Sequence, residues 1–395
     1  MPISNRIKTS LQKGSWIRKM FEEGDKLKAK LGAENVYDFS LGNPFGEPPE
    51  EFSTELRKII DDPTPGMHRY MPNAGFPNTR ESIAQVLAED SGLDVKWDNI
   101  IMTCGAGGGL NVVLNSLLDS GDEVIVLSPF FAEYRFYIAN YSGICIEVPT
   151  NKEFNIDLDA LDKAITPKTR AIIVNSPNNP TGVVYNSETL KGLEGLLRKK
   201  EGELNSVVYV VSDEPYKKLV YHGIEVPDMF KHIKNSIVVT SHSKDLSIPG
   251  ERIGYIAVSP NAADVRDIMN GFTFCNRTLG FVNAPALMQR VCAKLQRVCV
   301  DVTDYQEKGD LFYKRLTKMG YEMVKPQGAF YLFPKSPIED DVAFVRKAQE
   351  KNILIVPGSG FGTPGYFRIS YCVEMRAIEK SLEGFGELAR EHGLS

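Results

Sequence analysis

Residues 207–216 read Val-Val-Tyr-Val-Val-Ser-Asp-Glu-Pro-Tyr, an apolar run that passes into a polar segment. A short run of apolar, mostly β-branched residues is typical of a strand that is buried on both faces of a sheet. Asp213 follows this run, so its carboxylate is expected at or near the edge of the sheet. The alternative is that Asp213 caps the start of a short helix.

Similar apolar runs recur through the centre of the chain, at 100–103, 123–127, 144–148, 171–175, 237–240 and 253–258. Segments with helical periodicity lie between most of them, at 110–118, 133–141, 158–164 and 187–199. This alternation predicts an α/β fold whose large domain has a mostly parallel sheet of about seven strands between helices.

The pattern changes after residue 283. A long helical stretch is expected over 284–317, followed by short strands at 329–333, 353–357 and 366–371 and a last helix over 375–390. These elements predict a smaller α+β domain. The predicted boundaries are 1–42 for an N-terminal arm and part of the small domain, 43–285 for the large domain and 286–395 for the small C-terminal domain.

The N-terminal stretch is basic and leads directly into an amphipathic helix expected over 16–31. Its basic residues are Arg6, Lys8, Lys13, Arg18 and Lys19. We interpret it as a structural arm because the basic run continues into the helix. A targeting segment is the alternative, although the stretch lacks the apolar core of a secretory signal.

The composition excludes several classes of protein. The chain has 395 residues and a net charge of −5, and it has no block of basic residues of the kind that binds nucleic acid. No apolar run approaches the roughly 18 residues that a membrane span needs. The six cysteines form neither a CxxC pair nor a zinc-type cluster, so we expect reduced thiols, a cytoplasmic location and no metal site.

Polar motifs follow several of the predicted strands, and the carboxyl ends of strands in an α/β sheet are where ligands bind. Residues 103–109 read TCGAGGG before a helix, an arrangement in which backbone N–H groups can approach a phosphate. Residues 175–182 read NSPNNPTG and place Asn179 as a candidate ligand donor. The alternative for residues 103–109 is a plain strand-to-helix turn, and the alternative for residues 175–182 is a structural loop.

Two cationic residues also occupy unusual positions. Lys244 follows a central strand between hydroxyl residues, and Arg252 lies eight residues further on. A lysine that is partly desolvated among cations has a lowered pKa, which suits Schiff-base chemistry. Arg368 lies inside the apolar segment 366–371, where its planar fork could bind a carboxylate; an exposed arginine on an edge strand is the alternative.

Taken together, these motifs resemble those of the class I/II, fold-type I, pyridoxal-phosphate-dependent aminotransferases. The motifs that carry the resemblance are, in order, SLGNP (40–44), YMPNAG (70–75), NSPNNPTG (175–182), SDEPY (212–216), SHSK (241–244), ERIGY (251–255), QGAFY (327–331) and FRISY (367–371). The chain looks most similar to aspartate-aminotransferase-like members. The resemblance implies pyridoxal 5′-phosphate as cofactor and ping-pong transfer of an amino group from an L-amino acid to a 2-oxo acid.

The resemblance also implies roles at the cofactor ring. Lys244 matches the lysine that binds the cofactor covalently and moves the substrate proton. Asp213 matches the carboxylate that pairs with the pyridine nitrogen, and Asn179 and Tyr216 match the donors to the ring hydroxyl oxygen. Phe131 stands where family members stack an aromatic ring, commonly Tyr or Trp.

At the phosphate and substrate ends, the resemblance implies further contacts. The phosphate site would consist of the side chains of Ser241, Ser243 and Arg252 and the backbone of Gly105, Ala106 and Gly107. Gly42, Asn179 and Arg368 match the groups that hold the substrate α-carboxylate. Tyr70 matches a tyrosine that reaches the phosphate of a partner subunit, which implies a homodimer.

Two alternatives stay open for the activity. A C–S β-lyase would use the same fold, cofactor and lysine, and a non-catalytic cofactor-binding regulator would use the fold alone. Aspartate or glutamate is the favoured substrate by resemblance. A dicarboxylate substrate needs a second cation, for which Arg277 is a candidate, although it could also be a surface arginine or contact phosphate across a dimer.

Overall fold

The apolar runs form one seven-stranded sheet in the computed structural model, which describes residues 3–12 and 16–394. The strands are β2 (Ile100–Thr103), β3 (Glu123–Ser128), β4 (Ile144–Pro149), β5 (Thr169–Asn175), β6 (Tyr209–Asp213), β7 (Ser236–Ser241) and β8 (Gly254–Val258). Their order is β2-β8-β7-β6-β5-β3-β4, and β8 is antiparallel to both of its neighbours while the other pairs are parallel. The prediction of a mostly parallel α/β sheet is confirmed.

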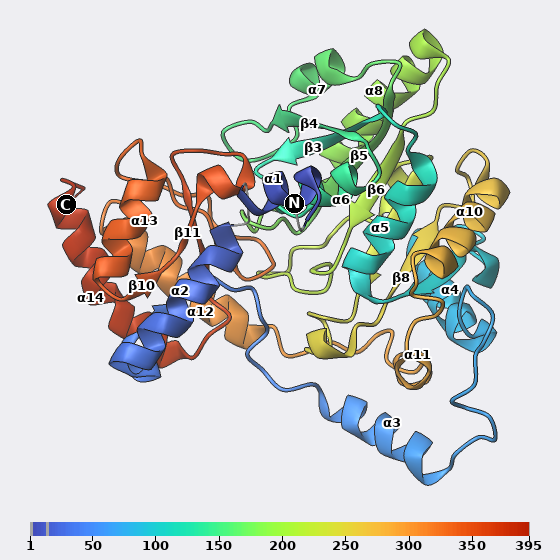
Figure 1. Cartoon of the computed structure of the whole chain (residues 1–395), viewed down its shortest axis with the longest axis horizontal. Helices are drawn as coiled ribbons and strands as arrows, with labels where there is room; N and C mark the ends of the chain where they lie inside the picture. Colours follow the sequence, from blue (N-terminus) through green and yellow to red (C-terminus); the bar gives the residue numbers. More distant parts are fainter. Residues whose placement is uncertain (1–2, 13–15, 395) are drawn as a thin grey trace.

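Helices cover both faces of this sheet (Figure 1). Successive strand residues point to opposite faces, so Val124 and Val126 pack with one group of helices and Ile125 and Leu127 with the other. The first group is α5 (Gly105–Leu117), α6 (Tyr134–Asn140) and α10 (Val265–Thr278). The second group is α4 (Pro77–Ser91), α7 (Leu158–Ala164), α8 (Ser187–Leu204) and α9 (Met229–His232).

A second, smaller body lies at the left of Figure 1 and combines the two ends of the chain. Strand β1 (Tyr37–Asp38) pairs in parallel with β10 (Ile353–Leu354), and β11 (Val356–Pro357), β12 (Phe367–Ser370) and β9 (Tyr331–Leu332) form an antiparallel sheet. Its helices are α2 (Trp16–Leu31), α12 (Thr303–Lys318), α13 (Asp341–Glu350) and α14 (Met375–Glu391). The domain boundaries given above stay a prediction.

Two predicted elements are wrong in detail. The helix expected over 284–317 is two helices, α11 (Ala286–Cys292) and α12, joined by residues 293–302. The strand expected over 353–357 is divided between β10 and β11, which pair in different sheets. Apolar residues recur at helical spacing across 293–302, but the backbone of this segment bonds to the side chain of Lys218, which follows β6, and to the backbone of Asp245, which follows β7.

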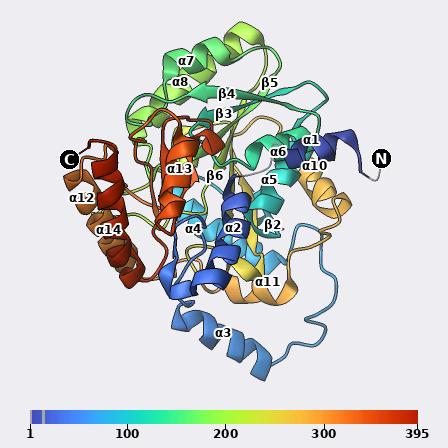
Figure 2. The ribbon, with the colours of Figure 1, turned by 60° about the vertical axis from the view of Figure 1, so that its left-hand side comes forward.

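Helix α3 (Glu50–Asp61) stands apart from the two bodies, whereas helix α1 (Asn5–Gln12) is drawn beside α6 in both views (Figures 1 and 2). Figure 2 shows α3 beside α11, with long connections to the rest of the chain. Lys13, in the basic N-terminal stretch, lies outside the described residues. In the part of the chain that the structure describes, every helix is too short or too polar to traverse a bilayer.

Candidate active site

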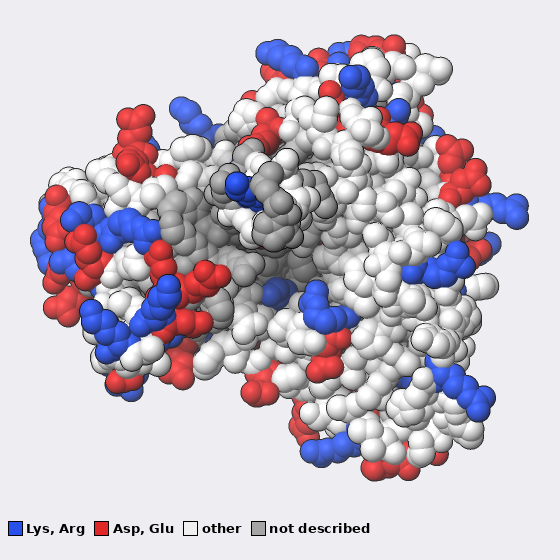
Figure 3. Space-filling model, viewed as in Figure 1, with Lys and Arg blue, Asp and Glu red and all other residues white. Residues whose placement is uncertain are grey.

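A cavity of about 280 Å³ lies at the carboxyl ends of the central strands. Figure 3 shows a hollow between the two bodies on this face of the molecule. The predicted residues that line the cavity are Gly42, Ala106, Gly107, Phe131, Asn179, Asp213, Tyr216, Ser241, Ser243, Lys244, Arg252 and Arg368. The fold therefore brings together side chains that follow β2, β3, β5, β6 and β7 with one from β12.

Lys244 lies in the turn that follows β7. Its Nζ donates a hydrogen bond to the backbone oxygen of Gly42 across 2.6 Å. Burial of the amine lowers the pKa of Lys244 to about 8, and the positive charges of Arg252 and Arg368 contribute to the same shift. An amine with this pKa is neutral in an appreciable fraction near pH 7–8, which both a nucleophile and a general base require.

Asp213 is the last residue of β6 and is buried. Its Oδ2 accepts a hydrogen bond from the hydroxyl of Tyr134 across 2.5 Å, whereas its Oδ1 has no partner among the described residues. Burial raises the pKa of Asp213 to about 7, although the hydrogen bond from Tyr134 opposes that shift. A cationic donor placed at Oδ1 would therefore be strongly favoured.

Arg368, on β12, is buried with 2% of its surface exposed. Its Nη1 donates to Oδ1 of Asn179 across 3.0 Å, and its Nη2 donates to the backbone oxygen of Ser40. The guanidinium lies between the rings of Tyr331 and Phe361, each centroid 4.8 Å away. Both hydrogen-bond partners are neutral, and Nε has no partner in the described structure, so the buried charge lacks an anion.

The loop 175–182 is held by its own asparagines. The amide nitrogen of Asn175 donates to the backbone oxygen of Asp213 across 2.8 Å, and Oδ1 of Asn175 accepts from the backbone nitrogen of Asn179 across 2.7 Å. The first bond connects the ends of β5 and β6, and the second holds the loop against the end of β5. The side-chain oxygen of Asn179, Oδ1, already accepts a hydrogen bond from Arg368. The side-chain NH₂ group of Asn179 therefore remains the donor for a ligand.

The end of the cavity where the sequence predicts a phosphate is formed by α5 and the turn after β7. Helix α5 begins at Gly105, about a turn earlier than the sequence predicts. Gly105 has a φ of +72°, and a Cβ added there would lie 2.7 Å from Nη2 of Arg252. The hydroxyl of Ser241 donates to Ser243 across 3.1 Å. Glycine at 105 thus allows the helix N-terminus and the Arg252 guanidinium to converge.

Sequence reasoning missed three tyrosines of this site. Tyr134 bonds Asp213, Tyr137 lines the cavity, and the Tyr331 hydroxyl lies 2.8 Å from that of Tyr216. Tyr331 belongs to the QGAFY motif, but the motif by itself assigns it no role. Tyr134 begins a helix, and the amphipathic pattern of that helix shows only that Tyr134 is buried. A tyrosine in a core helix carries no local signal that distinguishes a ligand contact from packing.

Comparison with known proteins decides the family. Residues 33–385 match the family described as aminotransferase class I and II. The chain belongs to this family. A probable aspartate aminotransferase of Methanocaldococcus jannaschii is 34% identical over 392 residues, covering 96% of this chain and 98% of that protein. An aspartate aminotransferase of Thermotoga maritima is 33% identical over 378 residues, covering 93% and 95%.

Solved structures agree with this class I and II aminotransferase assignment. An amino transferase from Eubacterium rectale superposes with a TM-score of 0.96 at 39% identity, covering 99% of each chain. The aspartate aminotransferase of Thermus thermophilus with maleate gives a TM-score of 0.87 at 28% identity, covering 98% of this chain and 100% of that one. These relatives are named as aminotransferases, which favours transamination over the lyase and regulator alternatives.

As an aminotransferase of this family, the protein uses pyridoxal phosphate to move an amino group between an amino acid and a 2-oxo acid. The cavity fits that cofactor. The unpartnered Oδ1 of Asp213 suits a protonated ring nitrogen, and the amine of Lys244 suits the aldehyde. Arg252 beside Gly105 supplies a charge for the phosphate. Described residues form no cluster of His, Cys, Asp or Glu that could hold a metal ion.

Three predicted residues, Gly105, Tyr70 and Arg277, are not among those that line the cavity. Tyr70 is 89% exposed, and Arg277 is exposed on α10 with its guanidinium 5.4 Å from the ring centroid of Phe274. Phe131 lines the cavity and contacts Tyr134 edge-to-face at a centroid distance of 5.6 Å. The positions of Tyr70 and Arg277 leave them accessible to a second subunit.

Proposed function

We propose that the aminotransferase acts on a dicarboxylic L-amino acid, aspartate or glutamate, with Lys244, Asp213 and Tyr216 as catalytic residues. Arg368 supports the binding of the α-carboxylate, which all amino-acid substrates share. Its buried guanidinium bonds only neutral groups and lines the same cavity as Lys244. A substrate carboxylate would supply the missing anion through a charge-assisted hydrogen bond.

When bound, pyridoxal phosphate supplies a carbonyl that condenses with amines and a ring that withdraws electrons from the substrate α-carbon. We assign its covalent attachment to Nζ of Lys244 and the ring-nitrogen contact to Oδ1 of Asp213. The amide of Asn179 and the hydroxyl of Tyr216 would donate to the ring hydroxyl oxygen, and Phe131 would cover the ring. The phosphate would bind Ser241, Ser243, Arg252 and the backbone of Gly105, Ala106 and Gly107.

Lys244 has a second role once the substrate amine has replaced it. Its Nζ takes the proton from the substrate α-carbon and later returns a proton, which its pKa of about 8 allows near neutral pH. The backbone oxygen of Gly42 restrains the amine. Arg368 and Asn179 hold the α-carboxylate, so that the Cα–H bond is presented to Nζ in one orientation.

The side-chain carboxylate of the substrate needs a further cation. The cations among the described residues that line the cavity are Lys244, Arg252 and Arg368, and each already has a role here. The second cation would therefore come from a partner subunit, and exposed Arg277 is our candidate. The names of the relatives, which include aspartate and aspartate/prephenate aminotransferases, support a dicarboxylic substrate.

We further propose that the protein is a cytoplasmic homodimer in which Tyr70 of each subunit completes the phosphate site of the other. Tyr70 is exposed in the single chain, so its hydroxyl is available to a second copy. The six cysteines are free, which agrees with a reducing compartment.

Steady-state rates for a panel of amino donors with 2-oxoglutarate, or with oxaloacetate when glutamate is the donor, test the substrate assignment. We expect aspartate and glutamate to give the highest kcat/KM values. A preference for leucine or phenylalanine would contradict the dicarboxylate assignment. Steady release of pyruvate and ammonia from cystathionine without an acceptor would instead indicate lyase chemistry.

Subunit mixing tests the shared site. Lys244→Ala and Tyr70→Ala each remove one part of a site, so each homodimer is expected to be impaired. A mixed dimer contains one site with both Lys244 and Tyr70, and activity should rise after the two variants are unfolded and refolded together. If the mixture shows only the sum of the separate activities, Tyr70 does not act across the interface.

A further inference from the structure

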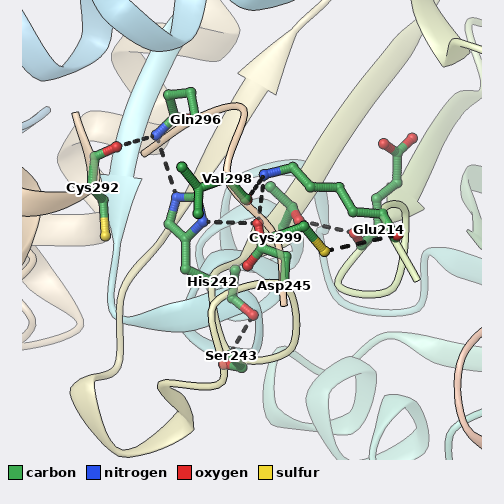
Figure 4. Close-up of polar contacts among 11 residues, drawn as sticks. Glu214, His242, Ser243, Asp245, Cys292, Gln296, Val298 and Cys299 are labelled. Atoms are coloured by element: carbon green, nitrogen blue, oxygen red, sulfur yellow. Dashed lines mark hydrogen bonds and ion pairs between the residues drawn. The ribbon is translucent and has the colours of Figure 1, made fainter. Parts of the chain in front are cut away.

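The turn that carries Lys244 presents side chains to two different cavities. Ser241, Ser243 and Lys244 line the cofactor cavity, whereas His242 and Asp245 line a separate cavity of about 280 Å³ on the other side of the turn. Figure 4 shows the imidazole of His242 directed toward Asp245 and Gln296 and away from Ser243. The catalytic turn therefore has a rear face made of titratable, buried side chains.

Asp245 is the centre of this rear face. Its Oδ2 accepts hydrogen bonds from Nδ1 of His242 across 3.1 Å and from Nζ of Lys218 across 2.8 Å. Burial by itself would raise the pKa of Asp245, but the charges and hydrogen bonds of His242 and Lys218 lower it to about 2. Asp245 is therefore a carboxylate that is held by two donors throughout the neutral pH range.

Gln296 contacts the second ring nitrogen of His242. Nε2 of Gln296 donates to the backbone oxygen of Cys292 across 2.7 Å, so this atom is the amide nitrogen. The same atom lies 3.4 Å from Nε2 of His242. The His242 ring is thus held between Asp245 and Gln296.

The same network ties the turn to the segment 293–302, which joins α11 to α12. Nζ of Lys218 also donates to the backbone oxygen of Val298 across 3.0 Å. The backbone oxygen of Asp245 accepts from the backbone nitrogen of Val300 across 2.7 Å. On the side away from the cofactor cavity, hydrogen bonds consequently join the turn that carries Lys244 to the segment that leads into the smaller body of the molecule.

We propose that His242, Asp245 and Lys218 are positioning residues that hold the Lys244 turn, so that Nζ of Lys244 stays aligned for proton transfer. None of the three lines the cofactor cavity, so they act through the turn and not on the substrate. Small displacements of a catalytic group reduce turnover strongly while leaving substrate contacts in place. This inference rests on the proton-transfer role of Lys244 proposed above.

The test uses the holoenzyme with Asp245→Ala, which removes the acceptor of both side-chain hydrogen bonds, and Asp245→Asn, which keeps an acceptor oxygen. We expect Asp245→Ala to lower kcat about 30-fold with KM for the amino donor unchanged within about twofold, because misalignment affects only proton transfer. The pH midpoint of the absorbance change of the Lys244-bound cofactor should also shift. Asp245→Asn should recover most of the turnover and the original midpoint.

Asp341→Ala is the matched control. Asp341 is also a buried carboxylate, and its Oδ2 accepts from the backbone nitrogen of Ser359 across 2.6 Å, but it lies on α13 in the smaller body. We expect it to lower the melting temperature without changing kcat or the absorbance midpoint. His242→Phe, which removes the polar contacts with Asp245 and Gln296 and keeps a ring of similar size, provides a second variant if Asp245→Ala does not fold.

The inference is overturned if Asp245→Ala or His242→Phe lowers the melting temperature as Asp341→Ala does but leaves kcat and the absorbance midpoint at their original values. The role of Lys244 is tested separately by Lys244→Ala. Loss of turnover in Lys244→Ala together with unchanged kinetics in Asp245→Ala would contradict the positioning role of the network but not the proposed role of Lys244. Normal turnover in Lys244→Ala would contradict the proposed function itself.

Discussion

The hydroxyl of Tyr134 donates a hydrogen bond to Oδ2 of Asp213 across 2.5 Å, although the two residues are 79 positions apart in the chain. Tyr134 begins α6 and Asp213 ends β6, so the bond crosses the end of the sheet. It occupies one carboxylate oxygen and leaves Oδ1, our proposed contact for the cofactor ring, without a partner among the described residues. The bond also favours the ionised carboxylate, which burial alone disfavours.

Tyr134→Phe removes this bond and should raise the pKa of Asp213 further above its ordinary value. Hydrogen bonds to charged groups contribute about 1.5–3 kcal/mol, so we expect cofactor affinity to fall about tenfold or more. Fluorescence titration of the apoenzyme with pyridoxal phosphate measures this change. Tyr185→Phe, at another buried tyrosine, is the control, and equal affinities in the two variants would contradict the assignment.

Asp213 also predicts a pH dependence for the stability of the apoenzyme. The folded-state pKa of about 7 lies above the ordinary value of 3.8, so the folded protein binds a proton that the unfolded chain releases. This carboxyl therefore costs stability increasingly as pH rises from about 4 to 7. We expect Asp213→Asn to have a larger free energy of unfolding than the wild-type apoenzyme. The difference between the two proteins should be greater at pH 8 than at pH 5. Denaturant melts that show the same difference at both pH values would contradict this.

Lys244→Ala should abolish the covalent attachment of the cofactor and the absorbance that depends on it. Removal of a general base lowers turnover by about 10²–10⁴-fold, and loss of the covalent step adds to that effect. Spectra and single-turnover rates with aspartate measure the two consequences. Lys217→Ala, one of the lysines near the sheet edge but outside the cofactor cavity, is the control. Wild-type turnover in Lys244→Ala would exclude its proposed role.

Arg368→Met should raise KM for the amino acid and for the 2-oxo acid about 100-fold, because a buried charge-assisted contact to the carboxylate is lost. Arg368→Lys should recover only part of the affinity, since a lysine cannot reproduce the planar fork. Initial rates over a wide substrate range measure both values. Arg297→Met, at an exposed arginine paired with Glu89 and Asp90, should leave KM unchanged. Equal KM values in the Arg368 and Arg297 variants would show that Arg368 does not bind substrate.

The sequence alone predicted the α/β sheet and most of the residues that line the cofactor cavity. Buried parallel strands give continuous apolar runs, and the polar residues at their ends must meet at one edge because the strands run in the same direction. That is why Lys244, Asp213 and Asn179 could be placed together without coordinates. The order of the motifs along the chain also predicted the neutral and cationic residues that surround these three side chains.

Only the tertiary structure decided which groups act on these residues. Tyr134 reaches Asp213, Tyr331 reaches Tyr216, and Asp245 is held from behind by Lys218, all through contacts between segments far apart in the chain. The break at 293–302 has the same origin, because helical spacing there is outweighed by tertiary hydrogen bonds. Local patterns record which face of an element is buried, but the partner on that face is set by how the chain packs.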